Sequence, residues 1–155
     1  LLNTVGGDVE AGLAIAEMIS SMTKPTVSLV LGGGHSIGVP LAVSADYSFI
    51  ARSATMTVHP IRTNGLVIGV PQSFEYLWKI QERITDFVER NSNISHDEFT
   101  KLLLNNDDIA NDVGTVLFGK DAAECGLINE VGGLSDAIDR LYSLIEKGKK
   151  DTDKH

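Results

Sequence analysis

The feature that most constrains this chain is a short apolar run followed at once by glycines. Residues 26–31 (TVSLVL) lack the polar alternation of a half-exposed strand, so they predict a strand covered on both faces, as in a parallel sheet between helices. We expect Gly32–Gly34 to break this strand and residues 37–45 to form a helix. Strand, small-residue turn and helix in this order favour an α/β domain.

Periodicity predicts further elements on both sides of this unit. Helices are expected at residues 9–22, 71–91, 95–104, 120–125 and 135–148, and strands at 47–51, 55–59 and 127–131. The first helix should bury a stripe of Ala11, Ile15, Met18, Ile19 and Met22. We expect loops at residues 60–70 and 105–115. The chain is therefore predicted to be one domain, residues 1–148, with a charged flexible tail at 149–155.

Composition and chain ends narrow the possible functions. The 155 residues carry a formal net charge of −8, which argues against nucleic acid as a partner. The single cysteine, Cys125, favours a reducing, cytoplasmic location. Residues 27–45 are nearly uncharged, but their glycines and Pro40 argue against a membrane span. Because the chain opens on Leu1-Leu2-Asn3 without an initiator Met, we expect a fragment whose N-terminal part is missing.

The clearest chemical signal is Gly34-His35-Ser36-Ile37-Gly38, which matches the pattern G-x-S-x-G. In that pattern, small flanking residues let the chain turn sharply between strand and helix, so that the serine hydroxyl is exposed as a nucleophile. The alternative is a glycine-rich turn with an incidental serine. The strand before Ser36 and the helix after it favour the nucleophile.

A serine nucleophile needs a base, and His59 is the best candidate because it ends a predicted strand. The other histidines are less suited: His35 adjoins the serine, His96 starts a capped helix, and His155 ends the chain. The carboxylate that would orient the imidazole stays open. The candidates are Asp107, Asp108 and Asp112, with Asp8 and Asp46 as earlier options.

Gly6-Gly7, before the first helix, offers backbone N–H groups that can stabilise an oxyanion, although a tight turn explains the pair equally well. No lysine follows these glycines, so a phosphate-binding loop is not indicated. One cysteine and scattered histidines predict no metal site, and no cofactor is expected.

Five motifs in order resemble the proteolytic subunit of Clp protease, ClpP, and its relatives. They are NTVGGDV (3–9), AGLAI (11–15), the Ser36 turn, MTVHP (56–60) and AAECGLI (122–128). The resemblance runs from Leu1 to about Val131. Two longer stretches, VLGGGHSIGVPLAVSADYSFIA and GLVIGVPQSFEY, are similar to a branch of this family from Gram-positive bacilli.

The resemblance implies a ClpP/crotonase-like fold, a spiral of β-β-α units, in which residues 71–104 form a protruding handle that helps to build rings. It implies Ser36 as nucleophile, His59 as base, and the backbone N–H groups of Gly7 and Ile37 as the oxyanion hole. Counted back from the Glu124-Cys125-Gly126-Leu127 motif, the family's catalytic aspartate falls on Gly114. Asp112, two residues earlier, is therefore the candidate for the third group.

Together, these observations predict a serine endopeptidase of the ClpP type that forms a homo-oligomeric ring and acts on peptides or proteins, such as signal peptides or secretory precursors. The need for an ATPase partner stays open. An α/β-hydrolase is a weaker alternative, because that fold orders its triad Ser, acid, His. A crotonase-like acyl-CoA enzyme is another, since ADYSFIA (45–51) also resembles that branch. The third is a ring-forming scaffold whose site has decayed.

Overall fold

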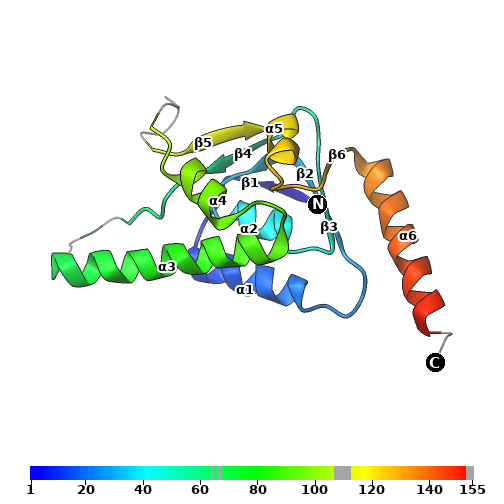
Figure 1. Cartoon of the computed structure of the whole chain (residues 1–155), viewed down its shortest axis with the longest axis horizontal. Helices are drawn as coiled ribbons and strands as arrows, with labels where there is room; N and C mark the ends of the chain where they lie inside the picture. Colours follow the sequence, from blue (N-terminus) through cyan, green and yellow to red (C-terminus); the bar gives the residue numbers. More distant parts are fainter. Residues whose placement is uncertain (64, 66–67, 107–112, 153–155) are drawn as a thin grey trace.

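The computed structural model of the chain describes residues 1–63, 65, 68–106 and 113–152. Within these residues, six strands and six helices form a mixed α/β arrangement (Figure 1). Along the chain they are β1 (Leu2–Thr4), α1 (Val9–Ser20), β2 (Val27–Gly34), α2 (Gly38–Val43), β3 (Tyr47–Ile50), β4 (Thr55–Val58), α3 (Val70–Asn91), α4 (His96–Leu103), β5 (Thr115–Phe118), α5 (Gly119–Glu124), β6 (Glu130–Val131) and α6 (Leu134–Thr152).

Strand β2 is the centre of the sheet. The strand order is β5-β4-β2-β3-β6, and β1 also pairs with β2. All neighbours of β2 run parallel to it, whereas β5 is antiparallel to β4. Ser28, Leu29 and Val30 are consecutive and all buried, so both faces of β2 are covered, as the sequence predicted.

The main core lies where α2, α3 and α4 pack beside the sheet. Phe87 of α3 and Phe99 of α4 are its largest fully buried side chains. A smaller cluster of Leu29, Phe49 and Ala137 attaches α6 to the other side of β2 and β3. The ends of β2 and β4, which carry the predicted site residues, are therefore held by a well-packed interior.

Two predicted boundaries are wrong because glycine is tolerated inside the elements concerned. The glycine run does not break β2, which continues to Gly34 and pairs with β4 through Gly33. Helix α6 passes Gly148 and ends at Thr152, whereas the prediction ended it at Gly148 and placed the tail from 149. A glycine in a helix interior costs only about 1 kcal/mol relative to alanine, which neighbouring turns can offset.

The sheet's far strands were also predicted incorrectly. Residues 115–118 form β5, although residues up to 115 were expected to be loop and 116–118 were assigned to no element. This strand exists through its pairing with β4, from Thr55↔Phe118 to Val58↔Thr115. Conversely, β6 is limited to Glu130 and Val131. Both differences depend on a partner strand that is distant in the sequence.

Helix α1 buries a different face from the predicted one. Gly12, Leu13 and Ala16 are buried, whereas Ile15 and Met18 are exposed. Gly12 packs so closely on the side chain of Ile37 that a Cβ at position 12 would overlap it. Close approach to α2 therefore selects the face with small residues, and the spacing of large residues does not reveal this.

Helix α3 divides into two parts, which we call the outer half (residues 70–80) and the inner half (residues 81–91). The inner half contains the buried Ile84, Thr85, Phe87 and Val88. No residue of the outer half, all of which the structure describes, is buried. Figure 1 shows the outer half projecting beyond the sheet, as expected for a handle. None of the described helices is long and apolar enough to cross a membrane.

Candidate active site

Ser36 lies in the turn between β2 and α2 with a backbone φ of 57°. Among the described residues it is the only non-glycine residue with a positive φ. Its backbone N–H donates to the carbonyl of Thr57 in β4 at 2.8 Å, so the turn is fixed to the neighbouring strand. Such a conformation costs on the order of 1–3 kcal/mol and is typical of functional sites. This is the geometry that presents a nucleophilic serine between strand and helix.

A second turn, between β1 and α1, packs directly on Ser36. Gly6 has a φ of 102°, and a Cβ there would lie 2.7 Å from the Cβ of Ser36. Only glycine permits this approach of the turn to the serine. Within the described chain, the backbone N–H groups of Gly7 and Ile37 donate to no other residue. Each of the two turns that meet at Ser36 thus carries one free backbone donor.

His59 follows β4 and, with Ser36, lines a cavity of about 30 Å³. No hydrogen bond joins Ser36 and His59 in the part of the chain that the structure describes. Instead, His59 Nδ1 lies 2.7 Å from the carbonyl oxygen of Pro60. Because a carbonyl can only accept, Nδ1 carries the proton and Nε2 is left as an acceptor. A general base needs this tautomer.

The other histidines have different neighbours. His35 Nδ1 is 2.9 Å from the hydroxyl of Thr57, and its ring lies beside Gly33. His96 starts α4 and pairs with Glu82 of α3, although the sequence analysis ascribed no contact to it. His155 lies outside the described residues. Of the described histidines, only His59 shares the Ser36 cavity.

The orienting carboxylate is not located by the structure. Asp107, Asp108 and Asp112 all lie outside the described residues. Gly114 has a φ of 129°, and a Cβ there would lie 2.5 Å from the carbonyl oxygen of Val58 and 2.9 Å from the Cβ of His59. The backbone next to His59 therefore has no room for a side chain at position 114.

The two earlier aspartates have local structural roles. Asp8 caps α1, and its Oδ1 accepts from the backbone N–H of Ala11 at 2.8 Å. Asp46 Oδ2 accepts from both the backbone N–H and the hydroxyl of Thr26. These hydrogen bonds account for both carboxylates without a catalytic role.

Gln81 is a site residue that the sequence analysis missed. Its Oε1 accepts from the backbone N–H of Ile61 at 3.0 Å, whereas its buried Nε2 has no hydrogen-bond partner among the described residues. Gln81 lines the Ser36 cavity and also a mainly apolar cavity of about 310 Å³. A signal was available, because Gln81 is four residues after Leu77 and three before Ile84, on the apolar stripe of the helix.

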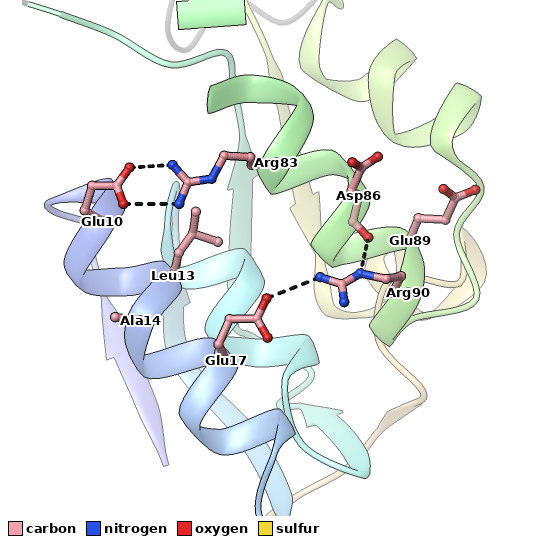
Figure 2. A pocket seen from close by; sticks show the side chains of 8 residues that line it. All are labelled: Glu10, Leu13, Ala14, Glu17, Arg83, Asp86, Glu89 and Arg90. Atoms are coloured by element: carbon pink, nitrogen blue, oxygen red, sulfur yellow. Dashed lines mark hydrogen bonds and ion pairs between the residues drawn. The ribbon is translucent and has the colours of Figure 1, made fainter. Parts of the chain in front are cut away.

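A surface cavity of about 480 Å³ lies between α1 and α3, and neither Ser36 nor His59 lines it. Figure 2 shows two glutamates of α1 paired with two arginines of α3 across it. Arg83 binds both carboxylate oxygens of Glu10, and Arg90 binds Glu17 at 3.2 Å. The hydrogen bond from Arg83 lowers the pKa of Glu10. This cavity is therefore a helix–helix contact in which two ion pairs join α1 to α3, whereas Asp86 and Glu89 form no ion pair with a lysine or arginine among the described residues.

Comparison with known proteins agrees with this geometry. The model of the Clp protease family matches residues 1–134. The chain belongs to the Clp protease family. Translocation-enhancing protein TepA of Halalkalibacterium halodurans (strain C-125) is 62% identical over 147 residues, which make up 95% of this chain and 57% of that protein. The chain thus spans little more than half of its curated relative's length.

These matches confirm the ClpP-like family, its mixed α/β fold and the similarity to the bacillus branch, of which TepA is a member. They also set aside the α/β-hydrolase alternative, because that fold is a different one. The family match does not by itself assign a catalytic role to Ser36 or His59.

Proposed function

We propose that the protein is a serine peptidase of the ClpP type. Ser36 attacks the carbonyl carbon of a peptide bond, and His59 Nε2 takes the hydroxyl proton. The N–H groups of Gly7 and Ile37 hold the oxyanion of the tetrahedral intermediate. The observation that carries the proposal is the strained Ser36 turn, which shares a cavity with His59 and contacts the Gly6 turn.

A carboxylate near His59 would assist catalysis because the imidazole becomes positively charged when it accepts the serine proton. When Nε2 takes the serine proton, the imidazole becomes a cation that still donates from Nδ1. The neutral carbonyl of Pro60 can orient that ring but supplies no negative charge to stabilise it. We therefore keep Asp112 as the proposed third group, with a Ser36–His59 pair oriented by Pro60 as the competing version.

The cavity that Ser36 and His59 share is too small to hold a peptide by itself. A cavity of about 30 Å³ has room for about one water molecule, not for a peptide. The neighbouring apolar cavity of about 310 Å³ shares Ile61 and Gln81 with it and would accept an apolar side chain next to the scissile bond. Catalytic hydrogen bonds often shorten only in the substrate complex, which fits the absent Ser36–His59 bond.

Active-site labelling of the full-length protein tests the proposal. A fluorophosphonate should label the wild type at Ser36, and Ser36→Ala should lose both labelling and peptide hydrolysis. Ser143→Ala is the matched control, because Ser143 Oγ lies on α6 and donates to the Asp139 carbonyl. Labelling that persists in Ser36→Ala, or hydrolysis that continues at the wild-type rate, would refute the proposed nucleophile.

A second pair of variants tests the third group. If Asp112 orients His59, then Asp112→Asn should lower kcat by about 10⁴-fold. Asp108→Asn, with the same charge change in the same loop, should leave kcat near the wild-type value. If both variants keep wild-type activity, the site works as a Ser36–His59 pair oriented by Pro60.

The same assays separate the remaining alternatives. A crotonase-like acyl-CoA enzyme would turn over a thioester without labelling at Ser36, and a decayed scaffold would neither label nor hydrolyse. The name of the similar protein, translocation-enhancing, favours signal peptides or secretory precursors as substrates. A homo-oligomeric ring and a cytoplasmic location belong to this proposal, and the single cysteine supports the location.

A further inference from the structure

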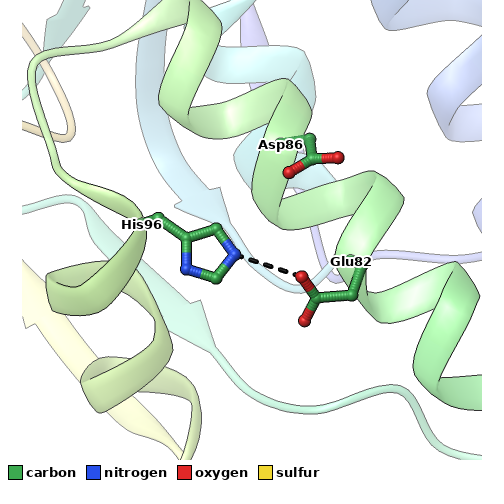
Figure 3. A group of neighbouring side chains, drawn as sticks. All are labelled: Glu82, Asp86 and His96. Atoms are coloured by element: carbon green, nitrogen blue, oxygen red, sulfur yellow. Dashed lines mark hydrogen bonds and ion pairs between the residues drawn. The ribbon is translucent and has the colours of Figure 1, made fainter.

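Folding brings three potential metal ligands together at the junction of α3 and α4, although the sequence predicted none. Glu82 and Asp86 are one turn apart on α3, and His96 is the first residue of α4 (Figure 3). Each offers one ligand atom, and these atoms lie within 4.8 Å of one another. We propose that Glu82, Asp86 and His96 bind a divalent transition-metal ion such as Zn²⁺.

One of the ligand pairs is already close enough to share an ion, and the others can be brought together by side-chain rotation. Glu82 Oε2 and His96 Nε2 are already 3.1 Å apart. Ligands about 2.0–2.2 Å from a tetrahedral ion are about 3.3–3.6 Å from each other, so the longest separation, which is within 4.8 Å, must close by up to about 1.5 Å through side-chain rotation. The side chains of His96 and Glu82 are 36% and 37% exposed, so they can rotate without repacking the core. Water can complete the coordination.

The donor set favours a transition metal over Mg²⁺ or Ca²⁺. An imidazole nitrogen suits Zn²⁺, Co²⁺ or Ni²⁺, whereas the hard cations prefer oxygen ligands alone. Asp97 Oδ1 lies 4.0 Å from His96 Nδ1, on the side of the ring away from the carboxylates of α3. A carboxylate near the second nitrogen is the usual way in which a metal-binding imidazole is oriented.

The surrounding charges also favour a cation. The basic residues of the inner half, Arg83 and Arg90, pair with Glu10 and Glu17 of α1. In the ranges that the structure describes, no lysine or arginine pairs with Glu82 or Asp86. Glu89 adds a further carboxylate, which accepts from the backbone N–H of His96. The hydrogen bond to Glu82 raises the pKa of His96.

Zinc titration of the tag-free, full-length protein tests the proposal. Calorimetry or competition with a chromophoric chelator should show one saturable Zn²⁺ site per chain. His96→Ala and Glu82→Gln should each weaken its affinity by at least about 10-fold, and Asp97→Asn by about 10-fold through loss of orientation. Co²⁺ should give d–d absorption bands that disappear in His96→Ala.

Two matched controls distinguish ligation from general attraction. Glu89→Gln removes a neighbouring charge but keeps an acceptor for the His96 N–H, and His155→Gln removes an imidazole elsewhere. Both should bind Zn²⁺ like the wild type. The site is refuted if Zn²⁺ does not bind, if His96→Ala binds equally well, if Glu89→Gln weakens binding as much as Glu82→Gln, or if Mg²⁺ binds as tightly as Zn²⁺. Circular dichroism of each variant establishes that it is folded.

Discussion

The two halves of α3 have similar amphipathic sequences but different surroundings. In the inner half, Phe87 and Val88 are at most 1% exposed within the domain's own core. In the outer half, Phe74 and Trp78 are 65% and 47% exposed, and their rings stack on each other with centroids 6.3 Å apart. Periodicity therefore identifies the apolar face of a helix, but it does not say what covers that face.

This difference in exposure predicts that the inner half stabilises the fold of the subunit, whereas the outer half contributes to assembly. Removing apolar contacts in the inner half should cost stability of the subunit, whereas changes in the outer half should affect what the subunit binds. Large aromatic side chains of this kind are enriched at the centres of protein interfaces. We therefore expect another subunit of the proposed ring to cover the outer half.

The largest effect on subunit stability is expected at Phe87. Phe87→Ala would leave a cavity in the core and should lower the free energy of unfolding by about 3–5 kcal/mol. Phe74→Ala is the matched control and should lower it by less than about 1 kcal/mol, because that ring is already exposed. Urea unfolding under monomeric conditions measures both. Equal losses for the two variants would remove the distinction between the halves.

A smaller effect is expected at Gln81, where the halves meet. Gln81→Met keeps the size of the side chain but leaves the Ile61 N–H without its acceptor, at a cost of about 1–3 kcal/mol. The substitution also removes the buried Nε2, which has no hydrogen-bond partner among the described residues, and this gain offsets part of the cost. Gln72→Met, in the exposed first turn, should change stability by less than about 0.5 kcal/mol. If Gln81→Met is neutral, the hydrogen bond to Ile61 contributes nothing net.

For Trp78→Asp we expect a still smaller change in subunit stability, below about 0.5 kcal/mol for an exposed position. The change should instead appear in the assembly, because a charge at the centre of an interface is expensive to bury. Analytical ultracentrifugation of the full-length protein should show smaller species with unchanged circular dichroism. An oligomer of wild-type size would argue that Trp78 is not in the interface.

The smallest expected effect is a pH dependence of subunit stability, which arises from the contact between Glu82 of the inner half and His96. Glu82 raises the pKa of His96 above its ordinary value of 6.5, so the folded state binds the proton more tightly than the unfolded state. The resulting stabilisation is complete below pH 6.5 and disappears as the pH rises through the raised pKa. Unfolding with a metal chelator present should show this slope in the wild type. His96→Gln should flatten it, and a slope of opposite sign would contradict the assigned pair.

The local parts of this molecule could be predicted from the sequence. The strand before Ser36 and the helix after it depend on neighbouring residues, so their order and approximate positions are as expected. Strand β5 could not be predicted, because it is defined by its pairing with β4. The buried face of α1 was missed because Gly12 and Ala16, not the larger side chains, allow its close packing.

Contacts between residues that are far apart in the sequence were the hardest to predict. Gln81 meets Ile61 twenty positions away, and His96 meets Glu82 across the turn between α3 and α4. Both contacts depend on how α3 lies against its neighbours, which no local pattern encodes. That Ser36 and His59 line one cavity was foreseeable only because strand ends of a parallel sheet commonly carry functional groups on one edge.

Gly114 also limits how the site could be re-engineered. Its backbone conformation and its contact with the Val58 carbonyl mean that a designer could not install an aspartate there by a single exchange. The new side chain would push β5 away from β4 beside His59, and the imidazole would move with its strand. A carboxylate for this histidine has to come from another position in the chain, such as the proposed Asp112, so the loop before β5 and the catalytic chemistry can only be redesigned together.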